Sequence, residues 1–372
     1  MTGAGPPLAG LKVVELARIL AGPWAGQVLA DLGAEVTKVE SPEGDDTRRW
    51  GPPFVTNDDG SEDAAYFHAT NRGKLSVVAD FATHEGRETV LDLVREADVL
   101  IENFKLGGLA KYGLDYASLH QINPRLVYCS ITGFGHDGPY AARAGYDFIV
   151  QGMSGIMDLT GDPHGPPMKI GVAYADILTG LYAVIAIQAA LRQRERTGQG
   201  QHIDMALLDV MTGTLANQAM NYLVSGKAPH RLGNAHPNIA PYEAFPVADG
   251  WVILAVGNDA QFLRLCDVID IVYEKKWWTN AGRVRDRVAL SQAIAAQTRD
   301  WERDTLLAAL EEQGIPGGPI NTVAEALSDP QIAARGMVLD LGEGLKGLRT
   351  PVRFSDAELA PPRRSPKLGK DG

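Results

Sequence analysis

The chain of 372 residues is predicted to be an α/β protein with a Rossmann-like parallel sheet in a large domain and a smaller inserted domain. Short β-branched runs alternate with helical patterns through its first third, and a parallel sheet covered by helices on both faces is the usual product of such alternation. From about residue 217 the chain becomes rich in loops and prolines, which indicates a second domain. We therefore expect a large domain over 1–215, a small domain over 231–321, and a return to the large domain over 335–372.

The elements of the large domain follow one another along the chain. Strands are expected at 12–16, 35–40, 75–80, 98–101, 126–131 and 201–208, and helices at 22–32, 86–97 and 114–122. A long apolar helix opens at Asp176 and is ended by Gly198. Further along, strands are expected at 251–256 and 350–354 and a helix at 304–313. Ligands of parallel sheets bind at the carboxyl ends of the strands, so the functional residues are sought in those loops.

Composition limits the class of protein. A net charge of -11 argues against nucleic-acid binding. Cys129 and Cys266 have neither metal-site nor disulfide spacing, so both are expected to be buried apolar groups. The most apolar run, 177–191, covers 15 residues, whereas a membrane span needs about 20. Met1–Pro7 lacks the basic and apolar pattern of a secretory signal. We expect a soluble, cytoplasmic protein.

Several common cofactor motifs do not occur. The first expected strand is not followed by the glycine pattern of dinucleotide-binding folds, and the chain has neither a phosphate-binding P-loop nor a serine nucleophile elbow. The eight histidines form no zinc-binding pair. We therefore expect no permanently bound cofactor and no metal.

Asp176 allows two interpretations. A carboxylate at a helix start is often only a cap, because the free backbone N–H groups and the helix dipole favour an anion there. It can also be a nucleophile, since carboxylates form covalent acyl intermediates. Its position alone favours the cap. With an ordinary aspartate pKa it would be ionised at neutral pH and would need no general base.

Basic and amide residues cluster at the ends of the expected strands. Arg72 and Lys74 precede one strand, Asn103 and Phe104 follow another, and Arg143 lies just before Tyr146. In an acidic protein, cations in such loops could bind a phosphorylated ligand. Ordinary surface charge is the alternative for each of them.

The order of the motifs resembles family III CoA-transferases over nearly the whole chain. The matching stretches are 7–16, 20–23, 31–40, 71–76, 131–135, 194–201 and 315–321. The resemblance implies that Asp176 is the nucleophile and that CoA and acyl-CoA are substrates rather than bound cofactors. It also implies an interlocked homodimer. The residues that the resemblance implies for CoA binding are Leu20, Ala21, Arg72, Lys74, Asn103, Phe104, Arg143 and Tyr146.

Within the family, the stretches 45–54, 143–147 and 240–245 resemble the succinyl-CoA-dependent dicarboxylate enzymes, such as succinate–hydroxymethylglutarate CoA-transferase. The expected reaction moves CoA from an acyl-CoA to a free, dicarboxylic acid. The alternative is the α-methylacyl-CoA racemase branch, which carries a histidine where this chain has Tyr146, and Asp259 lies near the position of its acid. Tyrosine, with a reference pKa near 10, is a poor proton shuttle. A non-catalytic CoA-binding protein is the third possibility.

Overall fold

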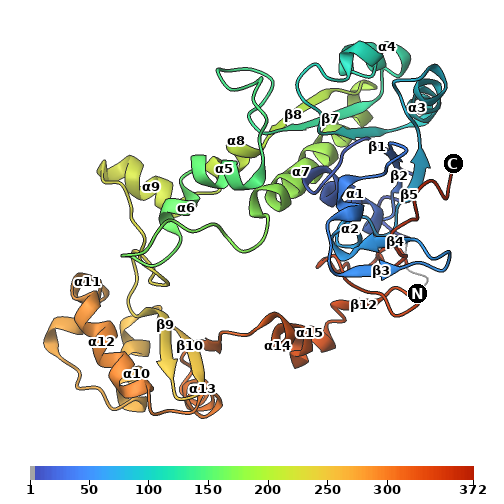
Figure 1. Ribbon diagram of the computed structural model, residues 1–372. Helices are drawn as coiled ribbons and strands as arrows, with labels where there is room; N and C mark the ends of the chain where they lie inside the picture. The colour runs from blue at the N-terminus through green and yellow to red at the C-terminus, as the bar shows by residue number, and fades with distance from the viewer. Residues whose placement is uncertain (1–4) are drawn as a thin grey trace. The chain divides into compact units, whose positions relative to one another are not determined.

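A computed structural model describes residues 5–372 (Figure 1). Residues 1–4 lie outside the described residues; they belong to the segment that is expected to lack a secretory signal. The chain divides into two compact units. The first comprises the chain up to Ile156, Lys169–Gly226 and Gln331–Gly372, and the second comprises Met157–Met168 and Lys227–Pro330. The short segment 157–168, which the sequence analysis placed within the large domain, thus groups with the second unit.

The first unit is built on a six-stranded, fully parallel sheet, which confirms the predicted α/β class. The strands lie in the order β5 (Leu75–Val78), β2 (Glu35–Glu40), β1 (Lys12–Glu15), β6 (Val99–Glu102), β7 (Val127–Thr132) and β8 (His202–Ala206). The strand order reverses between β1 and β6. Doubly wound sheets bind their ligands at such a switch point, outside the carboxyl ends of the strands.

Both faces of the sheet are buried because successive side chains of a strand point to opposite faces. Val13 packs in the cluster that contains α1 (Ala21–Asp31) and α7 (Tyr174–Thr197). Val14, the next residue, packs in the cluster that contains α3 (His84–Glu96) and α4 (Tyr116–Ile122). The two helical layers are visible on either side of the strands in Figure 1. This arrangement explains why the strands are apolar on both faces.

The helix α7 has 24 residues and is long and apolar enough, by length and composition, to cross a membrane. The helix was expected from the sequence, but its 15-residue apolar run, 177–191, was expected to be too short to span a membrane. Ala183 and Ile187 of α7 have no exposed surface and lie in the core beside the sheet. Core helices of soluble proteins pass the same test, and 39% of the apolar stretch of α7 is buried inside the structure. Gly198, in a left-handed conformation, ends the helix as expected.

The second unit contains an antiparallel sheet of β9 (Tyr242–Val247), β10 (Gly250–Ala255) and β11 (Gly317–Pro319). The unit also contains the helices α10 (Asp259–Val268), α11 (Asn280–Arg285), α12 (Arg287–Thr298) and α13 (Arg303–Glu312). Buried residues of α10, α12 and α13 form one core with the sheet. Phe245, Phe262 and Leu306 are fully buried there. The expected strand at 251–256 and the expected helix at 304–313 correspond to β10 and α13.

The other elements are short. They are β3 (Phe54–Thr56), β4 (Glu62–Ala64), α2 (Ala65–His68), α5 (Asp147–Met153), α6 (Ile156–Leu159), α8 (Leu207–Gly213), α9 (Ala216–Ser225), α14 (Val323–Ser328), α15 (Pro330–Ala334), β12 (Val338–Asp340) and β13 (Lys346–Leu348), with 3-10 turns η1 (Asp46–Arg49), η2 (Ala110–Tyr112) and η3 (Lys275–Trp277).

Two expected strands differ from the structure. The strand expected at 201–208 ends at Ala206, because α8 begins at the next residue. The strand expected at 350–354 is wrong, since that segment is irregular. Pro351 lacks the N–H that a sheet ladder needs, which outweighs the β-branched residues around it. Cys129 and Cys266 are both buried free cysteines, as expected.

Candidate active site

Asp176 lies in the first turn of α7 but is not its cap. The cap position is Ala173, which offers no side-chain hydrogen bond. The N–H groups at the helix start are instead satisfied by the carboxylate of Asp147, the first residue of α5. Its Oδ1 accepts the N–H of Ala175 at 2.8 Å and that of Asp176 at 3.4 Å. Within the described residues, no donor is hydrogen-bonded to the Asp176 carboxylate. The carboxylate is therefore available for chemistry.

The surroundings of Asp176 favour its neutral form. Burial and, to a smaller extent, the nearby charge of Asp147 together raise the pKa of Asp176 to about 7. The expectation that this carboxylate is fully ionised at neutral pH is therefore wrong. With this pKa, both the neutral and the ionised form of the carboxyl group are populated near pH 7.

A close crossing of two glycines holds Asp147 in place. An ideal Cβ on Gly133, just after β7, would lie 2.4 Å from the Cα of Gly145. No side chain fits at this crossing, so the backbone beyond β7 passes directly against the residues that open α5. Tyr146 lies between this crossing and Asp147, and its side chain is 66% exposed. The backbone contact thus fixes where α5 starts.

The start of α1 lies beside α7, one helical turn from Asp176. An ideal Cβ on Gly180 would lie 2.7 Å from the carbonyl oxygen of Ala21. Residues four apart lie on roughly the same face of a helix, so Asp176 is one turn away from this contact on that face of α7. The contact between Gly180 and Ala21 therefore places the start of α1 beside the first turns of α7.

A side-chain clamp joins the two strands of the switch point. Oδ1 of Asn103, just after β6, accepts the N–H of Arg18 at 2.9 Å, and its Nδ2 donates to the Arg18 carbonyl at 2.7 Å. The Arg18 guanidinium lies 5.6 Å from the ring centroid of Phe104. Leu20 and Ala21 follow Arg18 directly. Four of the predicted CoA-binding residues are thus gathered at the carboxyl ends of β1 and β6.

Tyr66 is close enough to Asp176 and Asp147 to be influenced by their charges, although the sequence analysis did not select it. Burial raises the pKa of its phenol, and the charges of Asp176, Asp147 and Asp45 raise it further, so its hydroxyl lies in their field. The ring of Trp50 packs edge-on against it at 5.3 Å between centroids. Tyr66 belongs to α2, which has only four residues, and no motif in the sequence marks it.

Two predicted site cations are buried and already paired. Arg72 forms an ion pair with Asp31, and its backbone N–H donates to Oε1 of Gln27 at 3.1 Å. The ammonium of Lys74 lies 2.8 Å from Glu15 and donates to Oδ1 of Asn71 at 2.8 Å. Burial lowers the pKa of Lys74 to about 8. Both cations therefore lie in the protein interior, paired with carboxylates, rather than facing solvent.

Two other candidates, Arg143 and Asp259, make contacts of their own. Arg143 is exposed and stacks on the ring of Tyr140, with 4.0 Å between the guanidinium carbon and the ring centroid. Asp259, the residue near the racemase acid, is in the second unit and forms an ion pair with Arg283 at 2.7 Å.

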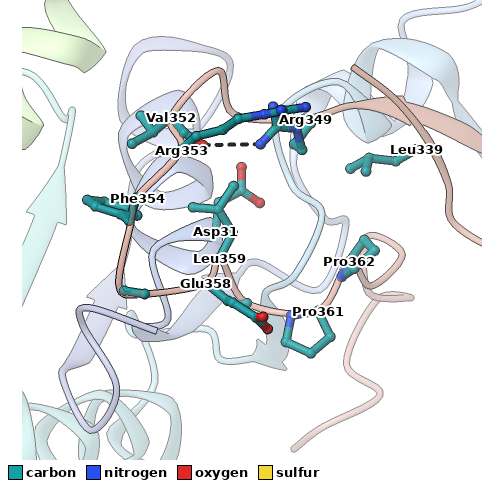
Figure 2. Close-up of a pocket in the computed structure, with 12 residues that line it drawn as sticks. Asp31, Leu339, Arg349, Val352, Arg353, Phe354, Glu358, Leu359, Pro361 and Pro362 are labelled. Atoms are coloured by element: carbon teal, nitrogen blue, oxygen red, sulfur yellow. Dashed lines mark hydrogen bonds between the residues drawn. The ribbon is translucent and has the colours of Figure 1, made fainter. Parts of the chain in front are cut away.

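The protein also contains a cavity of about 450 Å³ near Asp31, lined mainly by the segment 349–362 (Figure 2). Its charged groups are largely engaged: Arg349 donates to the carbonyl of Val352 at 3.1 Å, and Asp31 bonds to Arg72 and Thr350. None of the catalytic or CoA-binding residues predicted from the sequence lines this cavity. Over residues 5–372, no cluster of three histidine, cysteine or acidic side chains could hold a metal ion.

Comparisons with known proteins agree on the family. The model of CoA-transferase family III matches residues 8–372. Succinate–glutarate CoA-transferase from Agrobacterium fabrum is 59% identical, and the alignment covers 100% of this chain and 95% of that protein. Mouse succinyl-CoA:glutarate CoA-transferase is 40% identical over 98% of this chain and 84% of its own length. A CAIB/BAIF family protein from Brucella suis has a similar crystal structure, with a TM-score of 0.92, 64% identity and coverage of 99% and 97%. The chain belongs to CoA-transferase family III and is a CoA-transferase enzyme.

Proposed function

We propose that Asp176 transfers CoA by covalent catalysis. Its carboxylate attacks the thioester carbonyl of the donor, which gives a mixed anhydride and a CoA thiolate. The thiolate attacks the aspartyl carbonyl, so the donor acid leaves and an aspartyl-CoA thioester remains. The acceptor carboxylate then attacks that thioester, forming a second anhydride and freeing the thiolate. Attack of the thiolate on the acceptor's carbonyl releases the new acyl-CoA and restores Asp176.

The observation that carries this proposal is the state of the Asp176 carboxylate. It accepts no hydrogen bond from the described residues, burial keeps its charge poorly solvated, and Asp147 satisfies the helix start in its place. A poorly solvated carboxylate is a stronger nucleophile than one held by donors. The start of α7 also favours the negative charge that develops during acyl exchange.

We propose succinyl-CoA as the donor and a short dicarboxylic acid, glutarate first, as the acceptor. The support is the name of the relative from Agrobacterium fabrum, which aligns with the whole of this chain, together with that of the mouse relative. Exchange of one thioester for another is nearly balanced in energy, so the reaction needs no further energy source.

We propose that CoA binds at the switch point of the sheet. The proposed site is lined by four residues that lie at the carboxyl ends of β1 and β6: Leu20, Ala21, Asn103 and Phe104. Tyr146 and Arg143 lie just before α5, and their exposed side chains would meet the acyl and phosphate groups.

For Arg72 and Lys74 we propose an indirect part in CoA binding. Both are buried and paired, Arg72 with Asp31 and Lys74 with Glu15. Their ion pairs would hold the backbone around the CoA site in place, and neither side chain would contact the ligand.

We also propose that the active form is an interlocked homodimer in the cytoplasm. Apolar side chains are exposed along α7 and α9, including Ile185 at 62%, Leu223 at 71% and Val224 at 81%. A second copy would bury them. Sedimentation should give a dimer, and Ile185→Glu should shift the mass towards the monomer if α7 lies in the interface.

Intact-protein mass spectrometry tests the catalytic proposal. Wild type mixed with succinyl-CoA should gain a CoA adduct, and hydroxylamine should convert that adduct to an aspartyl hydroxamate at position 176. Asp176→Asn should gain no adduct. Asp209→Asn is the matched control, because Asp209 also lies in the first turn of a helix but is exposed. Equal labelling of Asp176→Asn and wild type would exclude Asp176 as the nucleophile.

A further inference from the structure

The loop between β1 and α1 contains a strained residue at the proposed CoA site. Ile19 has a φ of +72°, a left-handed conformation that is a genuine outlier for a β-branched side chain. Leu20 and Ala21, the next two residues, lead into α1. Strained backbone of this kind persists only where its surroundings hold it, and it concentrates at ligand-binding sites.

The carboxylate of Asp45 holds the Ile19 backbone. The N–H of Ile19 donates to Oδ1 and Oδ2 of Asp45 at 3.4 and 3.3 Å. Asp45 is only 1% exposed. Its Oδ1 also accepts the N–H and the hydroxyl of Thr47 at 2.9 and 2.7 Å, and its Oδ2 lies 2.9 Å from the ammonium of Lys38. These contacts leave the carboxylate no room to turn away from Ile19.

The residues before Ile19 are held by other side chains. The ammonium of Lys38 donates to the carbonyl of Ala17 at 2.9 Å. Asn103 clamps both backbone groups of Arg18, as described above. Side chains from β2 and from the end of β6 therefore hold the loop up to Arg18. The contact with Asp45 holds the next residue, Ile19, just before the start of α1.

We propose that Asp45 is a positioning residue for acyl-CoA binding. It keeps Ile19 left-handed, so that Leu20 and Ala21 are already placed for the ligand. The proposal rests on the CoA site proposed above, and Asp45 itself does not touch the substrate. Without Asp45, Ile19 relaxes to an ordinary backbone conformation, and the ligand has to restore the strained one. Such a change weakens apparent binding and leaves the rate at saturation nearly intact.

A double-mutant cycle with glycine at position 19 tests the idea, because glycine adopts left-handed backbone without steric cost. Asp45→Ala should raise the KM for succinyl-CoA about tenfold, with kcat changed less than about threefold. Ile19→Gly alone should change KM less than about threefold. Asp45→Ala combined with Ile19→Gly should return KM to near the value of the glycine variant. Loss of packing alone would not produce this rescue.

Asp63 supplies the matched control. It is also a buried carboxylate, 2.9 Å from Arg48 and 3.0 Å from Nδ2 of Asn57, but it has no contact with the loop. Ile19→Gly should not improve Asp63→Ala. The proposal is overturned if glycine at position 19 leaves the KM of Asp45→Ala unchanged, or if it improves Asp63→Ala equally.

If circular dichroism shows that Asp45→Ala is unfolded, Asp45→Asn tests the positioning role instead. The amide oxygen can still accept the N–H of Ile19, although it no longer balances Lys38. The positioning role predicts a KM within about threefold of wild type. A tenfold rise that Ile19→Gly does not repair would overturn it. If wild type transfers no CoA from succinyl-CoA, the proposed substrate fails instead, and this is known before any variant is compared.

Discussion

The carboxylate of Asp147 accepts the backbone N–H of Asp176 at 3.4 Å. One carboxylate therefore anchors the helix that carries the other, and its charge helps to raise the pKa of that partner. This relationship links the geometry of the site to its pH dependence, because a change at Asp147 alters both the start of α7 and the ionisation of Asp176.

The pH dependence of turnover should follow the ionisation of Asp176. Its pKa in the folded protein is raised to about 7, so the nucleophilic form is lost as pH falls through 7. We expect kcat/KM to fall about tenfold for each pH unit below that value. Initial rates from about pH 5 to 9, with protein stability checked at each pH, measure the acidic limb. A limb near pH 4 would show that Asp176 is ionised normally.

Asp147→Asn should move that limb to lower pH. The asparagine oxygen can still accept the N–H of Ala175, so the helix start is kept while the charge is removed. Because the Asp147 charge raises the pKa of Asp176, its loss lowers that pKa and makes the enzyme more active at acidic pH relative to its own maximum. Asp147→Ala, which also removes the cap, should cost about 1 kcal/mol of stability in a urea titration. Identical acidic limbs in Asp147→Asn and wild type would contradict the coupling.

Asp176→Asn should stabilise the protein at alkaline pH. The raised pKa means that the folded state holds the proton more tightly than the unfolded state, so this contribution to stability is full below about pH 4 and is lost as pH rises through 7. The neutral amide avoids the loss. We expect a gain of about 1–2 kcal/mol at pH 8 that vanishes at low pH, after allowance for partial solvent exposure. Chemical unfolding of both proteins at two pH values provides the comparison.

Gly180→Ala should disturb the contact between α1 and α7. The added Cβ would lie 2.7 Å from the carbonyl oxygen of Ala21, and a backbone atom cannot move aside as a side chain can. We expect a loss of about 1–3 kcal/mol of stability and a lower kcat/KM, because the start of α1 shifts relative to Asp176. Gly213→Ala is the control, since nothing lies within 4 Å of its Cβ position. Equal behaviour of the two variants would argue against a close contact.

Lys74→Met should reveal a structural rather than a ligand-binding residue. The substitution leaves Glu15 buried without one of its two lysine partners, which should cost about 3–5 kcal/mol. The expected result is a lower urea midpoint, with CoA affinity of the folded protein changed little. Asn103→Ala offers the contrast, because it releases Arg18 at the surface of the site. It should weaken CoA binding in isothermal titration with a smaller effect on stability. The reverse pattern would assign the direct contact to Lys74.

The sequence by itself determined the parallel sheet, most of its strands, the helix that carries Asp176, and Asp176 as a candidate nucleophile. These depend on local periodicity and on single residues such as Gly198, which act over a few positions. Only the tertiary structure decided the rest. It placed Asp147 at the start of α7, Tyr66 in the field of both carboxylates, and Arg72 and Lys74 in buried ion pairs. Those outcomes depend on which distant loops meet at the sheet edge and on how deeply each charge is buried. No local pattern contains that information, which is why the sequence favoured a helix cap at Asp176, whereas in the folded protein Asp147 accepts the N–H groups at the helix start.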